Sequence, residues 1–390
     1  MKISAVRSLV VNADMRNWVF VRVETDQPGL YGWGEATLEW KTGAVVGAIT
    51  DLAPLILGHD PRDIDRLTRI MIKHGFWPPG VIGLSAISGI EIALWDIFGK
   101  SVGQPVWRLL GGAARERIRV YTHLGLGEMK AVYETMSGTA LVERARAVVE
   151  RGYRAVKVVI IPYTHYTASP TEIAHVGTMM RGLREAVGQS IEIMVDFHGR
   201  PASVAAALAY IDALAPYRPM FVEEPVQPGD PRSMAAVTTR SPCPIAAGER
   251  LVDPRDFEAL FSRRAIHIAQ PDLCHCGGFS GARRIAAMAE TAGIGLAPHN
   301  PLGPIATIAA WHFDIATAGV VIQEEMSGAV PWFRDVVSGL PLLNDGCWPK
   351  PEGPGLGLEV NEEVAARHPF APEVLHPTHA VLDDGTIVDW

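Results

Sequence analysis

The chain has 390 residues, 48% of them hydrophobic, and at about 150 residues per domain this length predicts two or three folding units with sizeable buried cores. Its 35 lysine and arginine residues against 43 aspartate and glutamate residues give a formal net charge of −8. Nucleic-acid binding requires a basic stripe, whereas the longest basic clusters here are pairs such as Arg263-Arg264. Composition therefore argues against nucleic acid as a partner.

The cysteines and the apolar segments bear on cellular location. Four unevenly spaced cysteines are too few for a disulfide framework, which favours a reducing compartment. The first residues carry charges at Lys2 and Arg7, and the most apolar stretch, 304–322, contains His312 and Asp314. We therefore expect neither a secretion signal nor a membrane span, and a cytoplasmic protein.

The N-terminal part of the chain predicts strands followed by helices. Residues 19–24 alternate apolar and polar side chains, 26–29 supply turn residues, and 30–36 form a second short strand, which indicates a β meander. Apolar residues at helical spacing follow at 45–57 and 82–99. The second helix is apolar enough to be fully buried.

From about residue 118 the pattern changes to short apolar runs that alternate with alanine-rich helical segments such as 202–214 and 281–291. The predicted strands are 119–124, 155–161, 191–197, 220–226, 245–250, 266–273, 295–300 and 320–325. Alternation of strand and helix predicts parallel pairing through right-handed crossovers. Eight such units fit a (β/α)8-type barrel, so the fold class is α/β.

These patterns divide the chain into three regions. Residues 1–118 precede the barrel, 119–325 form it, and 326–390 follow it. The last region is rich in proline and glycine and has little periodicity. We expect it to pack against the other two regions and not to form a domain of its own.

Ionisable residues stand at the C-terminal ends of the predicted strands from the third strand onward, about 25 residues apart, which is the length of one strand–helix unit. They are Asp196, Glu223, Glu249, Asp272, His299 and Glu324. Loops at this rim of a barrel vary while the strands fix geometry, so chemistry is expected there. The alternative is that they are solvated charges or helix caps, which the recurrence in consecutive units disfavours.

Three adjacent strands would bring the carboxylates of Asp196, Glu223 and Glu249 together, and a fold sustains such a group only with a cation. Mg²⁺ is the natural occupant because it is a hard ion that prefers oxygen ligands. Side chains alternate along a strand, so only one of Glu223 and Glu224 can point inward, whereas Asp196 and His198 share a face. The sequence therefore predicts a magnesium site with His198 beside it.

Asp272 and His299 lie on neighbouring predicted strands. An aspartate that accepts a hydrogen bond from one imidazole nitrogen would orient the other nitrogen as a general base; a buried structural pair is the alternative. His275, between Cys274 and Cys276, resembles part of a soft-metal site, but no fourth ligand stands at a suitable spacing. We interpret His275 as loop packing.

With these motifs in place, the sequence resembles the enolase superfamily and, within it, the mandelate racemase subgroup. The likeness covers nearly the whole chain, and the motifs look like those of galactonate dehydratases. The segments that carry it are Gly32-Trp33-Gly34-Glu35, Ala93-Leu94-Trp95-Asp96, Asp196-Phe197-His198-Gly199-Arg200, Glu223-Glu224-Pro225, Gly248-Glu249-Arg250, Gln270-Pro271-Asp272 and Pro298-His299-Asn300-Pro301.

The resemblance implies an architecture and a set of roles. The N-terminal segment and the tail would form an α+β capping domain over the barrel mouth, and a homo-oligomer is suggested. Mg²⁺ would be held by the three carboxylates named above. The pair of Asp272 and His299 would be the base, Glu324 a hydrogen-bonding group at the substrate carboxylate, and His198 the general acid.

The second predicted strand departs from the racemases. Lysine-base members show Lys-x-Lys, whereas here Lys157 is followed by Val159. A racemase needs a base on each face of the substrate, so the missing lysine favours dehydration or another one-base outcome. Lys157 either acts electrostatically at the substrate carboxylate or extends to solvent from the strand end.

Two loops differ from those of galactonate dehydratases, namely 161–167 and the segment around Trp77. We expect both loops to face the sugar end of the substrate. Trp77 and Lys157 are expected to contact the substrate. A related aldonate or uronate-derived acid is therefore as compatible with the sequence as galactonate.

Together these features predict a Mg²⁺-dependent carbon–oxygen lyase. It would remove the α-proton of a small sugar acid, form an enediolate, and eliminate the β-hydroxyl to give a 2-keto-3-deoxy acid. The alternatives are a cycloisomerase or epimerase on a sugar acid or lactone, and a non-catalytic metabolite-binding barrel. A metal-dependent hydrolase is disfavoured because no His-x-His pair occurs among the 13 histidines.

Overall fold

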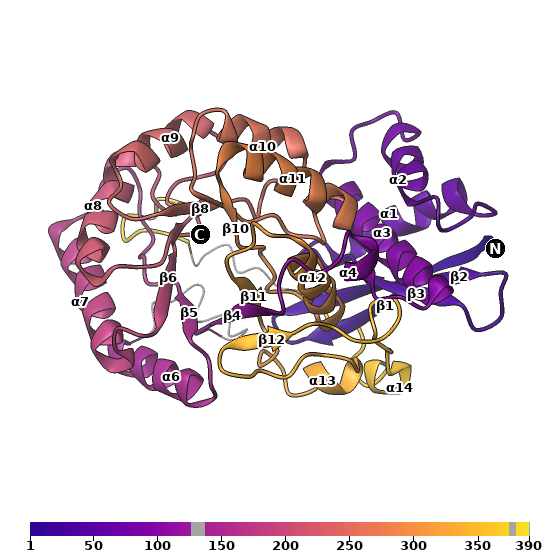
Figure 1. Cartoon of the computed structure of the whole chain (residues 1–390). Helices are drawn as coiled ribbons and strands as arrows, with labels where there is room; N and C mark the ends of the chain where they lie inside the picture. Colours follow the sequence, from indigo (N-terminus) through magenta and orange to yellow (C-terminus); the bar gives the residue numbers. More distant parts are fainter. Residues whose placement is uncertain (126–136, 374–379, 390) are drawn as a thin grey trace.

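The computed structural model describes residues 1–125, 137–373 and 380–389, which form a small α+β part beside a curled parallel sheet (Figure 1). The small part contains an antiparallel sheet in the order β1-β2-β3, and β2 pairs with both neighbours. Its elements are β1 (Ile3–Ala13), β2 (Arg16–Thr25), β3 (Tyr31–Glu35), α1 (Thr42–Ile56), α2 (Ile64–Lys73), α3 (Gly80–Val102) and α4 (Val106–Leu109).

Helix α3 packs closely against β3, and the glycines of the Gly32-Trp33-Gly34 motif explain how. A Cβ on Gly34 would lie 1.9 Å from the carbonyl oxygen of Gly89, and one on Gly32 would lie 2.1 Å from that of Ala93. Only glycine permits this approach of helix to strand. Among the described residues, α3 alone is long and apolar enough to cross a membrane, but 72% of its apolar window is buried inside the protein.

The curled sheet has the order β10-β9-β8-β7-β6-β5-β4-β11, with all neighbours parallel. A further parallel bridge between Leu296 and Val320 joins its two ends. Its strands are β4 (Arg117–His123), β5 (Ala155–Val158), β6 (Glu192–Asp196), β7 (Val222–Glu223), β8 (Ile245–Ala247), β9 (Ile268–Ala269), β10 (Gly295–Leu296) and β11 (Gln323–Glu325). The predicted α/β fold class with a barrel of this type is confirmed.

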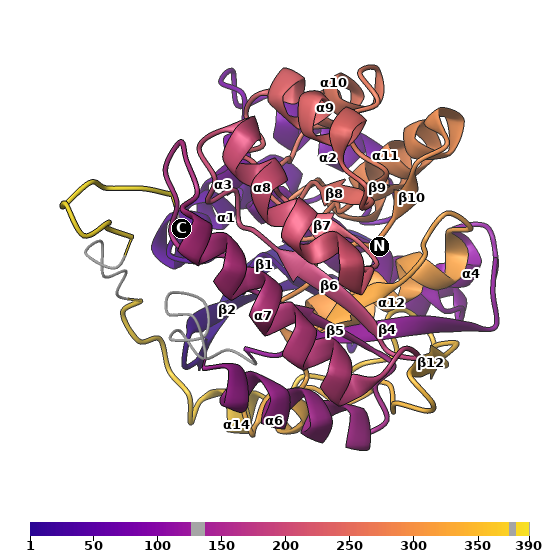
Figure 2. The ribbon, with the colours of Figure 1, turned by 90° about the vertical axis from the view of Figure 1, so that its left-hand side faces the viewer.

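Helices surround this sheet on the outside (Figures 1 and 2). They are α6 (Gly138–Glu150), α7 (Pro170–Val187), α8 (Val204–Leu214), η1 (Ala215–Tyr217), α9 (Pro231–Arg240), α10 (Pro254–Phe261), α11 (Gly278–Ala292) and α12 (Pro304–Ala316). Several strands are shorter than predicted because the chain leaves the ladder at the rim. The predicted strand 220–226 is only Val222–Glu223, since Glu224 already has a φ of 38°.

The C-terminal region contacts both other parts of the molecule. It contains α13 (Phe333–Val336), β12 (Cys347–Pro349) and α14 (Glu362–Ala365). Strand β12 pairs antiparallel with β4 of the barrel, while the amide of Asn12 in β1 donates to the carbonyl of His368 at 2.8 Å. The exact domain boundaries stay a prediction.

Buried carboxylates from the small part anchor it to helices of the barrel. Glu91 of α3 accepts hydrogen bonds from the amides of Phe279 and Ser280, both 2.9 Å, in the first turn of α11. Glu35 of β3 accepts from the amide of Gly303, at 2.8 Å, immediately before α12. A carboxylate at a helix N-terminus satisfies amides that have no partner within the helix. The small part is therefore fixed in place over the barrel.

Candidate active site

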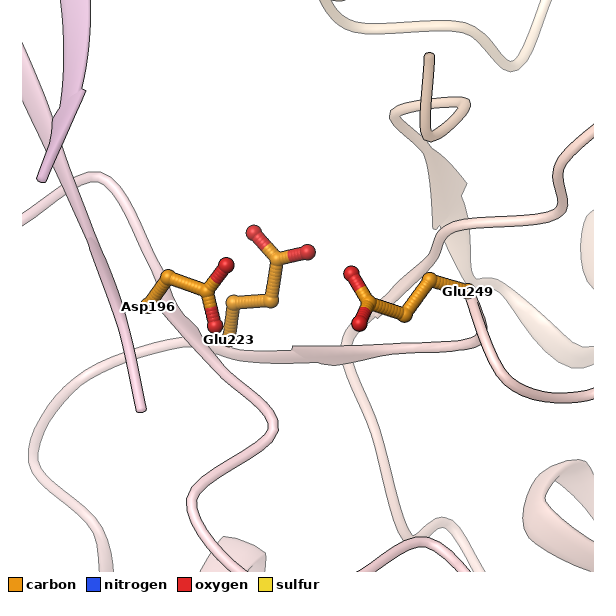
Figure 3. A group of neighbouring side chains, drawn as sticks. All are labelled: Asp196, Glu223 and Glu249. Carbon is orange, nitrogen blue, oxygen red and sulfur yellow. The ribbon is translucent and has the colours of Figure 1, made fainter. Parts of the chain in front are cut away.

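Three carboxylates from consecutive barrel strands point toward one another (Figure 3). Asp196 ends β6, Glu223 ends β7, and Glu249 follows β8 by two residues. One oxygen from each lies within 4.8 Å of the others. We call this group the carboxylate triad.

The backbone before Glu249 needs glycine. Gly248 has a φ of 148°, and a Cβ there would lie 2.9 Å from the amide nitrogen of Gln270, which directly follows β9. This close approach turns the chain so that Glu249 faces the other two carboxylates. The Gly-Glu order in the sequence thus has a geometric cause.

The triad is electrostatically suited to a cation. Burial, together with the neighbouring carboxylates, raises the pKa of Glu223 and Glu249 well above the ordinary value. Burial acts the same way on Asp196, but His198 and Lys157 outweigh it and lower the pKa of Asp196. Ionising all three together is unfavourable without added positive charge, and Oε1 of Glu223 is buried with no hydrogen-bond partner among the described residues. Three convergent oxygens with one unsatisfied fit a hard divalent cation.

Glu224, the neighbour of Glu223, points the other way. Its carboxylate receives hydrogen bonds from Arg250, including one from Nε to Oε2 at 2.9 Å. Arg250 also donates to the carbonyl oxygen of His198 at 3.2 Å. The alternation expected along this strand is present, and the outward pair ties together the loops that follow β6 and β8.

Lys157 does not extend to solvent; it is 2% exposed on β5. Its Nζ lies 2.6 Å from Oε1 of Glu324, 3.0 Å from Oε2 of Glu223 and 3.4 Å from Oδ2 of Asp196. Burial opposes the charge, but Glu223 and Glu324 raise the pKa of Lys157 well above its usual value. A fixed ammonium therefore lies beside the triad, where it could act electrostatically on a substrate carboxylate.

His299 and Asp272 form the pair expected from the sequence. Nδ1 of His299 lies 2.8 Å from Oδ2 of Asp272, and its Nε2 lies 3.2 Å from Oε2 of Glu249. Burial opposes the charged imidazole, but the hydrogen bond to Asp272 and the charge of Glu324 raise the pKa of His299 to about 9. The pair thus places a strongly basic imidazole at one end of the triad.

His198 occupies the other end. Its Nε2 lies 3.2 Å from Oδ2 of Asp196, and its backbone amide donates to Oδ1 of the same carboxylate at 2.9 Å. The residue has a φ of 51°, so the chain turns sharply just past β6.

Glu324, on β11, accepts a hydrogen bond from the amide of Asn300 at 3.0 Å in addition to its contact with Lys157.

All of these side chains except Glu223, Glu224 and Asp272 line one cavity of about 470 Å³, between the barrel mouth and the small part. The small part contributes Arg16, Glu39 and Lys41 to its wall. Trp77 is not among the lining residues and is 76% exposed. Its contact with a substrate stays a prediction.

Sequence reasoning missed two histidines that line this cavity. His123 ends β4, and the strand-end rule applied to the later strands would have found it on the first. His275, interpreted above as loop packing, is buried, with Nδ1 2.9 Å from Oγ of Ser85 and Nε2 3.7 Å from Oδ2 of Asp272. Its place in the wall depends on a contact with α3 that sequence spacing does not reveal.

Comparison with known families agrees with this architecture. Residues 6–111 match the N-terminal domain of mandelate racemase / muconate lactonizing enzyme, and residues 140–364 match the family described as enolase C-terminal domain-like. The chain belongs to the enolase superfamily. The predicted membership of its mandelate racemase subgroup is confirmed by the same matches.

Curated members of the superfamily resemble the chain along almost its whole length. A D-galactonate dehydratase from Pectobacterium atrosepticum is 35% identical over 385 residues, and one from Klebsiella pneumoniae is 36% identical over 384 residues. Each alignment covers 96% of this chain and 96% of the relative. These likenesses confirm the prediction of an enzyme of the dehydratase class, a carbon–oxygen lyase.

Solved structures of the superfamily share the fold. A mandelate racemase/muconate lactonizing enzyme-like protein from Roseovarius sp. TM1035 has a TM-score of 0.89 at 33% identity, covering 96% of this chain and 97% of that one. A mandelate racemase/muconate lactonizing enzyme from Jannaschia sp. CCS1 has a TM-score of 0.88 at 31% identity, covering 96% and 100%. The capping domain and barrel are therefore those of the superfamily.

Proposed function

We propose that this enzyme dehydrates a sugar acid, galactonate or a related aldonate, to a 2-keto-3-deoxy acid with the help of Mg²⁺. The observation that carries the proposal is the placement of two histidines at opposite ends of the carboxylate triad, His299 against Glu249 and His198 against Asp196. Relatives named D-galactonate dehydratase support the substrate class. Arg16, Glu39 and Lys41, which the capping domain contributes beside apolar residues such as Leu38 and Val81, suit a substrate that carries hydroxyl groups.

The carboxylate triad would hold the cation. Bound there, Mg²⁺ would neutralise the negative charge that develops on the substrate carboxylate when the α-proton leaves. Lys157 and Glu324 form a fixed ion pair beside this position and orient the same end of the substrate. An α-proton next to a carboxylate is otherwise barely acidic.

In its neutral form, which a cation held beside Glu249 would favour, His299 would take the α-proton on Nε2, since Asp272 occupies Nδ1 and fixes the orientation of the ring. The electron pair left on the α-carbon then forms the double bond to the β-carbon as the β-hydroxyl departs. His198 would give that hydroxyl a proton, so that water leaves. The resulting enol tautomerises to the 2-keto acid.

A one-base outcome fits the chain better than epimerisation. The position two residues after Lys157 is Val159, which cannot accept a proton, and Lys157 itself is held by three carboxylates. A cycloisomerase or epimerase on the same scaffold remains the second candidate function. It is favoured only if α-proton exchange occurs without elimination.

Incubation with a panel of aldonic and aldaric acids and Mg²⁺ tests the proposal. We expect 2-keto acid from galactonate or a related aldonate, with one solvent deuterium incorporated when the reaction runs in D₂O. Deuterium exchange into recovered substrate without 2-keto acid would establish the epimerase alternative. Silence across the panel, with Mg²⁺ bound, would favour a non-catalytic barrel.

We also propose a cytoplasmic homo-oligomer. The four cysteines are unpaired, which fits a reducing compartment. Phe76 and Trp77 of the capping domain are 85% and 76% exposed and pack edge to face, 5.2 Å between ring centroids. Large exposed aromatic residues are costly on the surface of a monomer.

A further inference from the structure

His123 lines the active-site cavity from β4, a strand that carries none of the residues of the proposed mechanism. It ends β4, where its Cα is paired in register with that of Lys157 on β5, and the other neighbour of β4 is β11, which carries Glu324. The residue is 9% exposed and lines the cavity. In the closed sheet β4 lies four strands from β8, so His123 stands across the barrel from Glu249.

The tautomer of His123 follows from its backbone contact. The amide of Gly125 donates to Nδ1 at 2.8 Å, so Nδ1 is an acceptor and the ring proton of the neutral imidazole sits on Nε2. Burial and the charge of Lys157 lower the pKa of His123 to about 4, which keeps the ring neutral at pH 7. Within the described part of the chain, Nε2 makes no hydrogen bond.

We propose that His123 is a further substrate-binding residue, which donates a hydrogen bond from Nε2 to a carboxylate or hydroxyl oxygen of the sugar acid. This inference rests on the proposed function. A neutral donor with a fixed proton recognises an oxygen acceptor, and Lys157 beside it attracts an anion. His123 would therefore hold the part of the substrate that lies across the barrel from Glu249.

Two substitutions separate the two nitrogens. In His123→Asn, the amide oxygen replaces Nδ1 and still accepts from Gly125, but the Nε2 donor is lost; in His123→Gln, the amide nitrogen reaches the place of Nε2. Calorimetric titration with galactonate and Mg²⁺, with each variant and its parent also carrying His299→Asn so that the acid is not consumed, measures binding. We expect about a 10-fold weaker Kd for His123→Asn, the loss of roughly one hydrogen bond, and less than about a 3-fold change for His123→Gln.

The outcomes distinguish the two proposals. If wild-type protein binds no aldonate, the proposed function fails and the role of His123 fails with it. If wild-type protein binds and dehydrates an aldonate but His123→Asn binds it equally well, only the role of His123 is wrong. Where His123→Asn does weaken aldonate binding, a short acid without any hydroxyl, such as acetate, tells the acceptors apart: weakening of both acids supports the carboxylate, and weakening of the aldonate alone supports a hydroxyl.

Discussion

The ammonium of Lys157 lies 3.0 Å from Oε2 of Glu223, the middle carboxylate of the triad. Both side chains are buried, so water screens this pair little. A fixed positive charge thus partly neutralises the site that is proposed to hold Mg²⁺. We expect this charge to lower the affinity for a cation and to raise the affinity for an anionic substrate.

The first prediction concerns this balance. We expect Lys157→Met, which keeps the length and apolar part of the side chain, to bind Mg²⁺ about 10-fold more tightly and galactonate about 10-fold more weakly than wild type. Isothermal titration calorimetry measures both constants, with galactonate titrated into proteins that also carry His299→Asn so that the acid is not consumed. Weaker Mg²⁺ binding by a variant that remains folded would contradict the view of Lys157 as a competing charge.

The second prediction concerns the triad itself. Glu223→Gln leaves the middle position neutral and with only one oxygen, so Mg²⁺ affinity should fall by about 100-fold or more, and dehydration should fall with it. Glu192→Gln is the matched control, because Glu192 begins β6 at the opposite end of the strand from Asp196. Equal Mg²⁺ binding by wild type and Glu223→Gln would remove Glu223 from the ligand set.

Which side chains form the active site could be partly predicted from the sequence. Asp196, Glu223, Glu249, Asp272 and His299 recur at the spacing of one strand–helix unit, and parallel strands bring their carboxyl ends to one rim. Spacing alone therefore predicted which side chains meet, although the strands that carry them are shorter than their apolar runs.

Contacts between the capping domain and the barrel could not be predicted from the sequence. Glu91 meets Phe279 across 188 positions of sequence, and nothing in the local pattern of α3 selects that partner. Trp77 was expected at the substrate because its loop differs from those of galactonate dehydratases; loop composition does not fix the direction of an exposed side chain, so this contact stays a prediction. Long-range docking of two surfaces decides such positions.

The third prediction separates the proposed acid from the proposed base. His299→Asn should lose both α-proton exchange and dehydration, by about 10²- to 10⁴-fold. His198→Asn should lose dehydration but keep exchange of the α-proton with D₂O, because removal of that proton needs only the base. Nuclear magnetic resonance of recovered substrate and a 2-keto acid assay provide the two readouts.

His175→Gln changes an exposed histidine on α7 and should behave as wild type. Undiminished turnover by His299→Asn would show that another residue is the base. Loss of exchange in a folded His198→Asn variant would mean that His198 acts before elimination.

The fourth prediction concerns assembly. Replacing both exposed aromatic residues, Phe76→Ser with Trp77→Ser, should shift the protein toward monomer in size-exclusion chromatography with light scattering. Leu342→Ser is the control, since Leu342 is 75% exposed elsewhere on the chain. An unchanged mass would show that the aromatic pair is not an interface. An unchanged mass, together with a raised KM for the single variant Trp77→Ser, would support the substrate contact predicted from the sequence.

The fifth prediction concerns the anchoring of the capping domain and its dependence on pH. Burial raises the pKa of Glu91 to about 7, although hydrogen bonds from Ser280, Trp95 and Phe279 oppose this. Its ordinary value is 4.5, so the folded chain retains a proton that the unfolded chain releases. The resulting stabilisation is complete below about pH 4.5 and is lost as the pH rises through about 7.

Glu91→Gln removes this titration and mismatches one amide donor of α11, so it should cost about 1 to 3 kcal/mol of unfolding free energy. Thermal unfolding of wild type and variant from pH 5 to pH 8 measures the effect. The advantage of wild type should shrink as the pH rises, because only its carboxyl group ionises. Glu290→Gln, on the exposed face of α11, should show no such trend, and parallel curves for wild type and Glu91→Gln would mean that Glu91 is charged throughout this range.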